Sequence, residues 1–322
     1  MSQDFAIIEQ QFYDFETKGE FEKALKLAEK AYRDFPSKQY QTGYWLAILY
    51  SRSGQLEKAV NILKETVESG IWWSPELLLT KRELQALNQF TEFHSILAQC
   101  QEAYKKALAQ SHPDYFIHVP KQQSNEKMPL ILSIHWRKGN ANDFSRYWLY
   151  SNLIEKFIFA FPQSSQICGT HDYCWDNREL AEKELIELYQ KIKQNNSIDE
   201  KQVVITGASQ GGRLAIDLVL SERIQSKGFI AVIPAIDRAE EYEELIKKAS
   251  KNHIHMKGVL VTGTKDPFFK QTKKLYELCL SYDFPCAIEI QDGVGHAFPD
   301  HFEAILNKAI QFILKTDFEK SI

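Results

Sequence analysis

Residues 202–220 join three patterns that together restrict the fold of this chain more than any other stretch. Val203–Ile205 is a short β-branched run, which is typical of a buried parallel strand. The next segment, Gly207–Gly211, reads G-x-S-x-G, and apolar residues then recur at helical spacing. A strand, a tight turn and a helix in this order predict an α/β fold with Ser209 at the end of a strand.

The glycines beside Ser209 suit a residue on a sharp turn. Such a residue holds a strained backbone conformation, so its neighbours must be small to avoid clashes. The turn lifts the Ser209 hydroxyl out of the sheet, where it can act as a nucleophile, and the backbone N–H of Gln210 can stabilise an oxyanion there. The alternative is a glycine-rich turn that binds a phosphate or nothing.

Two later loops supply the acid and the histidine that a nucleophilic serine needs. The apolar run Val259–Gly263 leads to Asp266, and the run Ala287–Ile290 leads to a glycine-flanked loop that contains His296. Both side chains follow the carboxyl ends of predicted strands, the edge where active sites of open α/β sheets lie. We expect His296 to take the proton from Ser209, and Asp266 to hold the tautomer of the imidazole and stabilise the imidazolium.

Other residues compete for these two roles. Asp266 could be an ordinary turn aspartate, because it precedes a proline. Asp292 and Asp300 are the alternative acids, and Asp292 lies only four residues before the histidine, which suits a loop neighbour better. His301 is the alternative histidine, although it falls in the predicted final helix.

In this order, Ser209, Asp266 and His296 resemble the catalytic residues of the α/β-hydrolase superfamily, and the resemblance covers residues 130–315. The string Gly-Ala-Ser209-Gln-Gly-Gly is similar to the phospholipase/carboxylesterase-like branch, which includes carboxylesterases, acyl-protein thioesterases and predicted esterases. The resemblance implies a mostly parallel sheet flanked by helices, and a serine hydrolase of carboxylic esters or thioesters. It also implies a Ser-Asp-His triad and an acyl-enzyme intermediate, with no cofactor or metal.

The segment Leu130–His135 reads as a central strand that leads to Trp136. In the hydrolases that this chain resembles, a His-Gly pair usually follows the strand, and the next backbone N–H is the second oxyanion donor. Trp136 takes the place of that glycine here. Every residue except proline has a backbone N–H, so we expect Trp136 to be the second donor beside Gln210. Its indole must then turn away from the acyl pocket or line it.

The run Phe157–Pro162 predicts the next strand, and a long polar and aromatic loop, 163–177, follows it. The resemblance implies that this loop borders the substrate. Tyr173 and Trp175 are therefore candidates for lining the acyl or alcohol pocket. The alternative for both is ordinary packing against the helix that follows.

The composition excludes several classes of protein. The 322 residues are enough for two domains, and the net charge of −4 gives no reason to expect a nucleic-acid partner. No apolar run approaches the ~20 residues of a membrane span. The five cysteines are scattered and odd in number, and no signal-peptide pattern is present, so we expect a cytoplasmic protein with free thiols. Cys168, His171 and Cys174 are only three potential zinc ligands, whereas a structural site needs four, so no metal is expected.

The first 110 residues show helical periodicity and a weak internal repeat. The heptapeptide that starts at Gly19 recurs at Gly54, 35 residues later, and a degenerate third copy starts at Asn88. The period is similar to that of tetratricopeptide repeats, in which two helices meet across small residues. We therefore predict an all-α tetratricopeptide-like domain over 1–110 and an α/β-hydrolase catalytic domain over 111–322. An unrelated helical bundle is the alternative for the first of them.

The helical domain is expected to contact a protein or peptide, to form a homodimer, or to pack on the hydrolase domain. Trp72 and Trp73 are candidate anchors for such packing. For the whole chain, the sequence predicts an enzyme, a serine carboxylic-ester hydrolase with a small-molecule or acylated substrate. Two alternatives remain: a serine peptidase or amidase on the same fold, and a non-catalytic scaffold protein that carries helical repeats.

Overall fold

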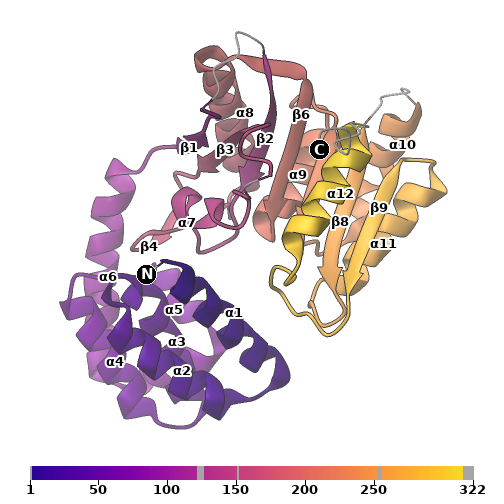
Figure 1. Ribbon diagram of the computed structural model, residues 1–322. Helices are drawn as coiled ribbons and strands as arrows, with labels where there is room; N and C mark the ends of the chain where they lie inside the picture. The colour runs from indigo at the N-terminus through magenta and orange to yellow at the C-terminus, as the bar shows by residue number, and fades with distance from the viewer. Residues whose placement is uncertain (1, 122–126, 151, 252–255, 315–322) are drawn as a thin grey trace. The chain divides into compact units, whose positions relative to one another are not determined.

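The chain divides into two compact units in the computed structural model (Figure 1). The first unit holds residues 1–111 and 166–173, and the second holds 112–165 and 174–322. The residues that the structure describes are 2–121, 127–150, 152–251 and 256–314.

Helices form most of the first unit, and they confirm the predicted all-α region. Six α-helices and two 3₁₀ segments precede residue 111, and a two-stranded hairpin from later in the chain joins them. The elements are α1 (Ser2–Lys18), α2 (Phe21–Asp34), η1 (Pro36–Lys38), α3 (Gln39–Arg52), α4 (Leu56–Glu68), α5 (Pro75–Thr80), η2 (Arg82–Gln89), α6 (Thr91–Gln110), β4 (Ile167–Gly169) and β5 (Asp172–Tyr173).

The two clear copies of the sequence repeat are helix pairs, α1 with α2 and α3 with α4. Gly19 and Gly54 lie in the turns of these pairs with φ of 72° and 75°, the left-handed region that favours glycine. Small residues let the helices approach, since a side chain at Gly43 would meet Thr66 Oγ1 at 2.9 Å. In the third copy, only α6 is a full helix, and the short α5 and η2 precede it. The likeness to tetratricopeptide repeats stays a prediction.

The β4–β5 hairpin is hydrogen-bonded to the segment between α4 and α5. Trp73 and Gly169 form a β-bridge, and the backbone N–H of Thr170 donates to the carbonyl of Trp72 at 2.8 Å. In return, the N–H of Trp72 donates to the Thr170 hydroxyl at 2.8 Å. Trp73 is fully buried in the core of the first unit. The two tryptophans therefore hold a segment that lies almost 100 residues later in the chain.

A seven-stranded sheet forms the centre of the second unit, in the order β1-β3-β2-β6-β7-β8-β9. Six strands are parallel, and only β1 runs antiparallel to its neighbour β3. The predicted strands are all present, and the structure adds β7, an apolar run that the sequence analysis did not single out. The strands are β1 (Asp114–His118), β2 (Met128–Ile134), β3 (Ile158–Gln163), β6 (Ile198–Ala208), β7 (Gly228–Val232), β8 (Lys257–Gly263) and β9 (Cys286–Gln291).

Helices cover both faces of this sheet, because alternate residues of each strand are apolar on opposite sides. Leu130, Leu132 and Ile134 of β2 pack toward α8, α9, α10 and α11, whereas Ile131 packs toward α7 and α12. Figure 1 shows α12 in front of the sheet and α9 behind it. The helices are α7 (Ala141–Ser145), α8 (Arg178–Asn195), α9 (Gln210–Leu220), η3 (Ala239–Tyr242), α10 (Glu243–Lys251), α11 (Phe269–Ser281) and α12 (Phe302–Leu314).

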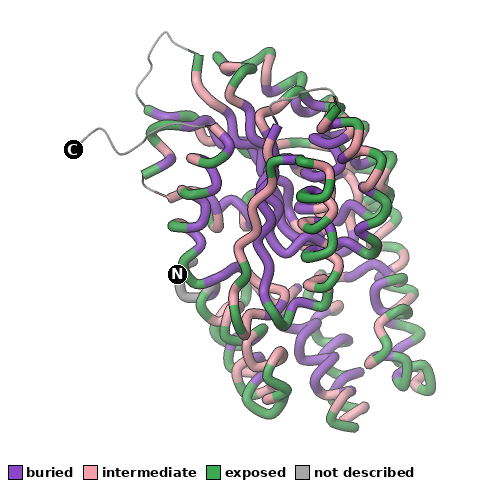
Figure 2. The backbone as a smooth tube through the Cα atoms, turned by 90° about the vertical axis from the view of Figure 1, so that its right-hand side faces the viewer, coloured by how far each residue is buried: buried purple, intermediate pink, exposed green. Residues whose placement is uncertain are grey.

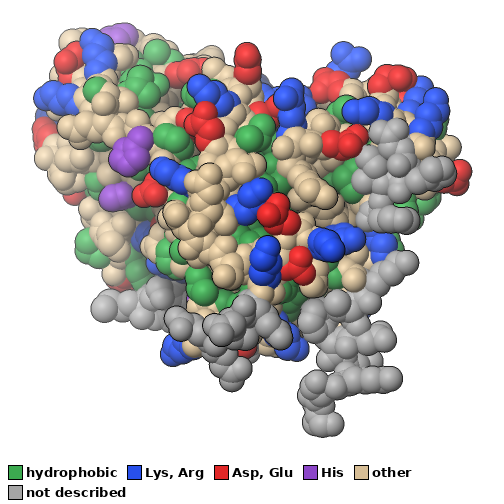
Figure 3. Space-filling model, turned by 90° about the horizontal axis from the view of Figure 1, so that it is seen from above, with side chains coloured by type: hydrophobic (Ala, Val, Ile, Leu, Met, Phe, Trp, Pro, Cys, Tyr) green, Lys and Arg blue, Asp and Glu red, His purple; other side chains and the backbone are tan. Residues whose placement is uncertain are grey.

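The strands at the centre of the sheet are buried, while the helices expose their outer sides (Figure 2). Basic and acidic side chains are interspersed on the face shown in Figure 3. Among the described helices, none is long and apolar enough to cross a bilayer. Within the same residues, no three His, Cys, Asp or Glu side chains form a group that could hold a metal ion. Cys168 and His171 lie in the β4–β5 segment of the first unit.

Candidate active site

Ser209 lies at the turn between β6 and α9 in a strained conformation, with φ of 54° and ψ of −117°. Two close approaches explain why glycines flank it. A Cβ at Gly207 would lie 2.4 Å from the carbonyl of Gly211, and a Cβ at Gly211 would lie 2.0 Å from the carbonyl oxygen of Ile134. Both distances are far below van der Waals contact, so only glycine fits at either position. The turn is therefore built into the packing of β6, α9 and β2.

The structure brings Ser209, His296 and Asp266 together from three separate loops. His296 Nε2 lies 2.8 Å from Ser209 Oγ, and His296 Nδ1 lies 3.1 Å from Asp266 Oδ1. The Asp266 carboxylate is fully buried, whereas a third of the His296 side chain is exposed. With Nδ1 protonated toward the carboxylate, Nε2 of a neutral ring is free to accept the serine proton.

Backbone and side-chain donors fix the Asp266 carboxylate. The N–H of Phe268 donates to Oδ1 at 2.9 Å, and the Thr262 hydroxyl lies 3.5 Å from Oδ2. Of the alternative residues, Asp292 accepts from the Thr264 hydroxyl at 3.1 Å, and His301 precedes α12, where its carbonyl accepts helical N–H groups. Neither alternative takes the place of Asp266 or His296 beside the serine.

Gln210 is the first residue of α9, so its backbone N–H belongs to the first turn, whose N–H groups have no acceptor within the helix. Its side chain reaches to the loop before α8. The amide oxygen accepts the backbone N–H of Trp175 at 3.0 Å, and the amide nitrogen donates to Asp176 at 2.7 Å. The side chain thus links the start of α9 to this loop.

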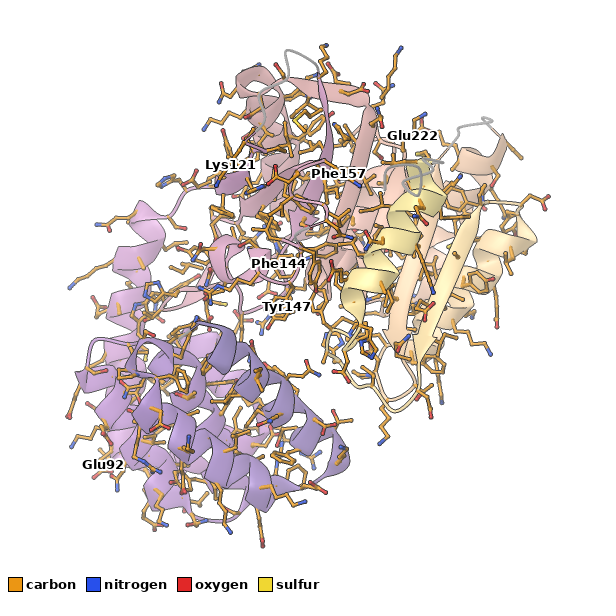
Figure 4. All side chains as sticks on the ribbon, in the orientation of Figure 1. Glu92, Lys121, Phe144, Tyr147, Phe157 and Glu222 are labelled. Carbon is orange, nitrogen blue, oxygen red and sulfur yellow. The ribbon has the colours of Figure 1, made fainter. Side chains whose placement is uncertain are left out.

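Trp136 directs its indole into an aromatic cluster. The ring centroids of Phe144, Tyr147 and Phe298 lie 5.3, 5.0 and 5.6 Å from that of Trp136. Phe144 and Tyr147 extend from α7 and the turn after it (Figure 4). The next residue after Trp136, Arg137, lines the pocket beside Ser209.

That pocket has a volume of about 480 Å³, and all of its lining residues belong to the second unit. Trp175, one of the two candidate lining residues, lies at this pocket, and its indole N–H donates to the carbonyl of His135 at 2.9 Å. Tyr173, the other predicted lining residue, pairs with Ile167 in the β4–β5 hairpin of the first unit. Besides Ser209 and Gln210, the remaining lining residues are apolar (Leu214, Ala235, Phe268) and charged (Arg137, Asp176, Arg178, Arg213, Asp237).

Carboxylates pair with each arginine of the pocket. Burial raises the pKa of the Asp217 carboxyl, and the neighbouring Arg178 counters that shift. Since four acids face these three arginines, the pocket has no excess positive charge for an anionic ligand. The pairs are Arg137–Asp176 at 2.9 Å, Arg178–Asp217 at 2.6 Å and Arg213–Asp237 at 2.9 Å, and Glu241 also lies 3.3 Å from Arg213.

Sequence reasoning did not identify Arg137 or Asp176 as residues of the site. Arg137 lies in the loop after β2 and Asp176 in the loop after β5, and a separation of 39 positions leaves no local pattern that could reveal the pair. The only available signal was position, because Arg137 follows the strand that leads to the predicted oxyanion donor.

His135, whose carbonyl accepts the indole N–H of Trp175, is completely buried, and burial lowers its pKa to about 4. Above pH ~6.5 the residue is neutral in the folded and the unfolded chain. Between pH ~6.5 and 4 only the unfolded chain takes up the proton. The free energy of unfolding should therefore decrease as the pH is lowered through this range, by about 1.4 kcal/mol per pH unit at most. Urea unfolding from pH 7 to 4.5 should show a loss that is larger by about 2 kcal/mol in the wild type than in His135→Gln. Parallel pH profiles for the two proteins would contradict this expectation.

Two family models match the chain. Residues 161–309 match the dienelactone hydrolase family, and residues 6–108 match a model described as the N-terminal domain of A/B hydrolase-like proteins. A search of curated proteins found no match.

Solved structures share the fold. An uncharacterized protein from Bacillus cereus ATCC 10987 is 24% identical, with a TM-score of 0.55 over 97% of this chain and 99% of that one. The match with a ferulic acid esterase (13% identity, TM-score 0.50) covers 63% of this chain and 92% of that one. The match with Est1E from Butyrivibrio proteoclasticus (15% identity, TM-score 0.50) covers 64% of this chain and 94% of that one. The first of these matches includes the helical region as well as the sheet.

Proposed function

Because this chain belongs to the α/β-hydrolase superfamily, we propose that it is a serine hydrolase that cleaves a carboxylic ester or thioester. The observation that carries the proposal is the continuous hydrogen-bonded series Asp266–His296–Ser209 at the carboxyl edge of the sheet, with distances of 3.1 and 2.8 Å. In this arrangement a serine hydroxyl can lose its proton as it attacks a carbonyl. The strained turn and the open pocket beside it leave room for the substrate.

The proposed reaction has two halves. Ser209 Oγ attacks the carbonyl carbon while His296 Nε2 accepts the hydroxyl proton, and Asp266 stabilises the resulting imidazolium through Nδ1–H. The tetrahedral intermediate collapses, the bond to the alcohol or thiol breaks, and His296 returns the proton to the leaving group. Water then attacks the acyl-enzyme by the same route and releases the carboxylic acid.

The proposed oxyanion hole consists of backbone N–H groups. Gln210 supplies the first from the start of α9, where the helix dipole also favours negative charge. Trp136 remains our candidate for the second. Arg137 is the other candidate in this segment, because it lines the pocket whereas the Trp136 indole packs in the aromatic cluster.

A fluorophosphonate probe tests the proposal directly, since it phosphonylates only an activated serine. We expect the purified wild-type protein to be labelled and Ser209→Ala to remain unlabelled. Hydrolysis of p-nitrophenyl esters, compared with the matching anilides, then separates an esterase from an amidase. A folded wild-type protein that takes no label would contradict the proposal and favour the scaffold alternative.

The charged lining of the pocket predicts a preference for short or polar substrate groups. A long alkyl chain would displace water from Arg137, Asp176 and Arg213 without the gain of about 0.8 kcal/mol per methylene that an apolar pocket gives. We expect kcat/KM for the p-nitrophenyl butyrate ester to exceed that for the decanoate ester by roughly tenfold or more. A series of acyl chain lengths measures this, and activity that rises steadily with chain length would contradict it.

A further inference from the structure

The carboxylate of Asp176 joins the two segments that we propose as the oxyanion hole. Its Oδ1 accepts from the Gln210 amide at 2.7 Å and from Arg137 Nε at 2.9 Å, and its Oδ2 accepts from Arg137 Nη2 at 2.9 Å. Gln210 belongs to the turn that carries the nucleophile, and Arg137 follows Trp136 after β2. One side chain is thus bonded to a residue from each segment.

The residue before it, Trp175, connects the same two segments a second time. Its backbone N–H donates to the Gln210 amide oxygen at 3.0 Å, and its indole N–H donates to the carbonyl of His135 at 2.9 Å. The indole is buried and lies 4.8 Å from the His135 ring. Residues 175 and 176 therefore act as a bridge between the start of α9 and the end of β2.

The ion pair of Asp176 with Arg137 adds little to the stability of the fold, because the two side chains are 44% and 36% exposed. An exposed ion pair contributes roughly 0 to 1 kcal/mol to stability. The geometry, in contrast, is specific: the guanidinium binds the carboxylate through two nitrogens, which fixes the orientation of both groups. Although partial burial acts to raise it, the pKa of Asp176 is lowered by the bonds from Arg137 and Gln210, so the carboxylate is held ionised.

We propose that Asp176 is a positioning residue for the oxyanion hole: it sets the distance between the backbone N–H of Gln210 and the donor in the Trp136–Arg137 segment. The inference rests on the proposed function. Oxyanion donors act only when they are held at hydrogen-bond distance from the oxygen as its charge develops. A small displacement of one donor can lower the rate about 100-fold without changing the binding of the ground state.

Two variants test this role. Asp176→Asn keeps the size of the side chain but places an amide NH₂ opposite two donors, and Asp176→Ala removes all three contacts. Glu222→Gln is the matched control, since it changes a carboxylate to an amide in the surface ion pair with Lys248 (3.4 Å). Glu222 follows the C-terminal end of α9, whereas Ser209 precedes the N-terminal end, and Glu222 is labelled in Figure 4. All three proteins are first titrated with a fluorophosphonate to count active sites.

For both Asp176 variants we expect kcat per active site to fall roughly 10- to 100-fold while KM changes by less than about threefold. A trifluoromethyl ketone, whose adduct with serine carries an oxyanion, should lose affinity by the same factor as kcat/KM. The affinity of the unreactive alcohol analogue of the substrate should not change. The control should match the wild type in every measurement.

Several results would overturn the role of Asp176. An increase in KM at constant kcat would make it a substrate-binding residue, and a smaller active fraction with normal kcat would make it a structural one. An unchanged or increased kcat would remove it from the reaction. Each of these outcomes requires an active wild-type enzyme, whereas a wild type with neither label nor ester hydrolysis would refute the proposed function itself.

Discussion

Replacement of Ser209 by alanine is expected to lower kcat for a p-nitrophenyl ester by at least ~10⁴-fold, because the nucleophile of the proposed reaction is lost. The fold should be retained. Alanine and serine carry the same β-carbon, so the residue at φ of 54° gains no new strain, and the hydroxyl bonds only to His296 among the hydrogen bonds found for it. Stopped assays over hours, with circular dichroism on the same sample, measure both effects.

The loss of activity in a double variant of Ser209 and His296 shows whether the two residues act as one catalytic unit or independently. His296→Ala should cost nearly as much as Ser209→Ala, and the double variant should be no worse than the more affected single one. Residues that act separately would instead multiply their effects. A Ser209→Ala protein that retained more than a tenth of the wild-type activity would show that another residue is the nucleophile.

Gly211→Ala is expected to cost at least about 3 kcal/mol of the free energy of unfolding, or to prevent folding altogether. The new methyl group would lie 2.0 Å from the carbonyl oxygen of Ile134 and 2.6 Å from that of His135. Both are backbone atoms at the end of the central strand β2, so neither can move aside without disturbing the sheet. Urea or thermal unfolding of the purified variant gives the loss.

The adjacent glycine supplies the control for this change. A Cβ at Gly212 would meet the carbonyl oxygen of Val232 at 3.1 Å, which a shift of a few tenths of an ångström relieves. Gly212→Ala should therefore cost about 1 kcal/mol, less than Gly211→Ala. Equal stability of the Gly211→Ala variant and the wild type would mean that the turn is not packed as tightly as its geometry indicates.

Local patterns were sufficient for the central strands of the sheet because these strands are buried on both faces. A strand of this kind must be a continuous apolar run, and runs such as Leu130–Ile134 and Val259–Gly263 stand out in the sequence for that reason. The strand β7 has the same pattern, with five buried residues, so the sequence carries the same signal for it. Positions after the carboxyl ends of these strands were also enough to nominate Ser209, Asp266 and His296, whose catalytic roles remain a proposal.

Contacts between distant segments could not be predicted in this way. The pairing of Arg137 with Asp176 depends on how two loops meet, and neither loop has a sequence pattern that fixes its path. The direction of the Trp136 indole depends on the space that Phe144, Tyr147 and Phe298 leave beside it. The hydrogen bonds of Trp72 with Thr170 join residues 98 positions apart, and no periodic pattern in the sequence predicts them.

The hairpin at Thr170 also determines the order in which the chain can fold during synthesis. The helices up to residue 110 leave the ribosome first. The backbone groups of Trp72 can form their hydrogen bonds with Thr170 only after residues 166–173 have been synthesised. By then β1, β2 and β3 have been made, and β6, which carries the serine turn, has not. A messenger truncated after codon 111 would therefore yield a helical unit with an unfilled hydrogen-bonding edge, and a protein that began at residue 112 would carry that hairpin without its support.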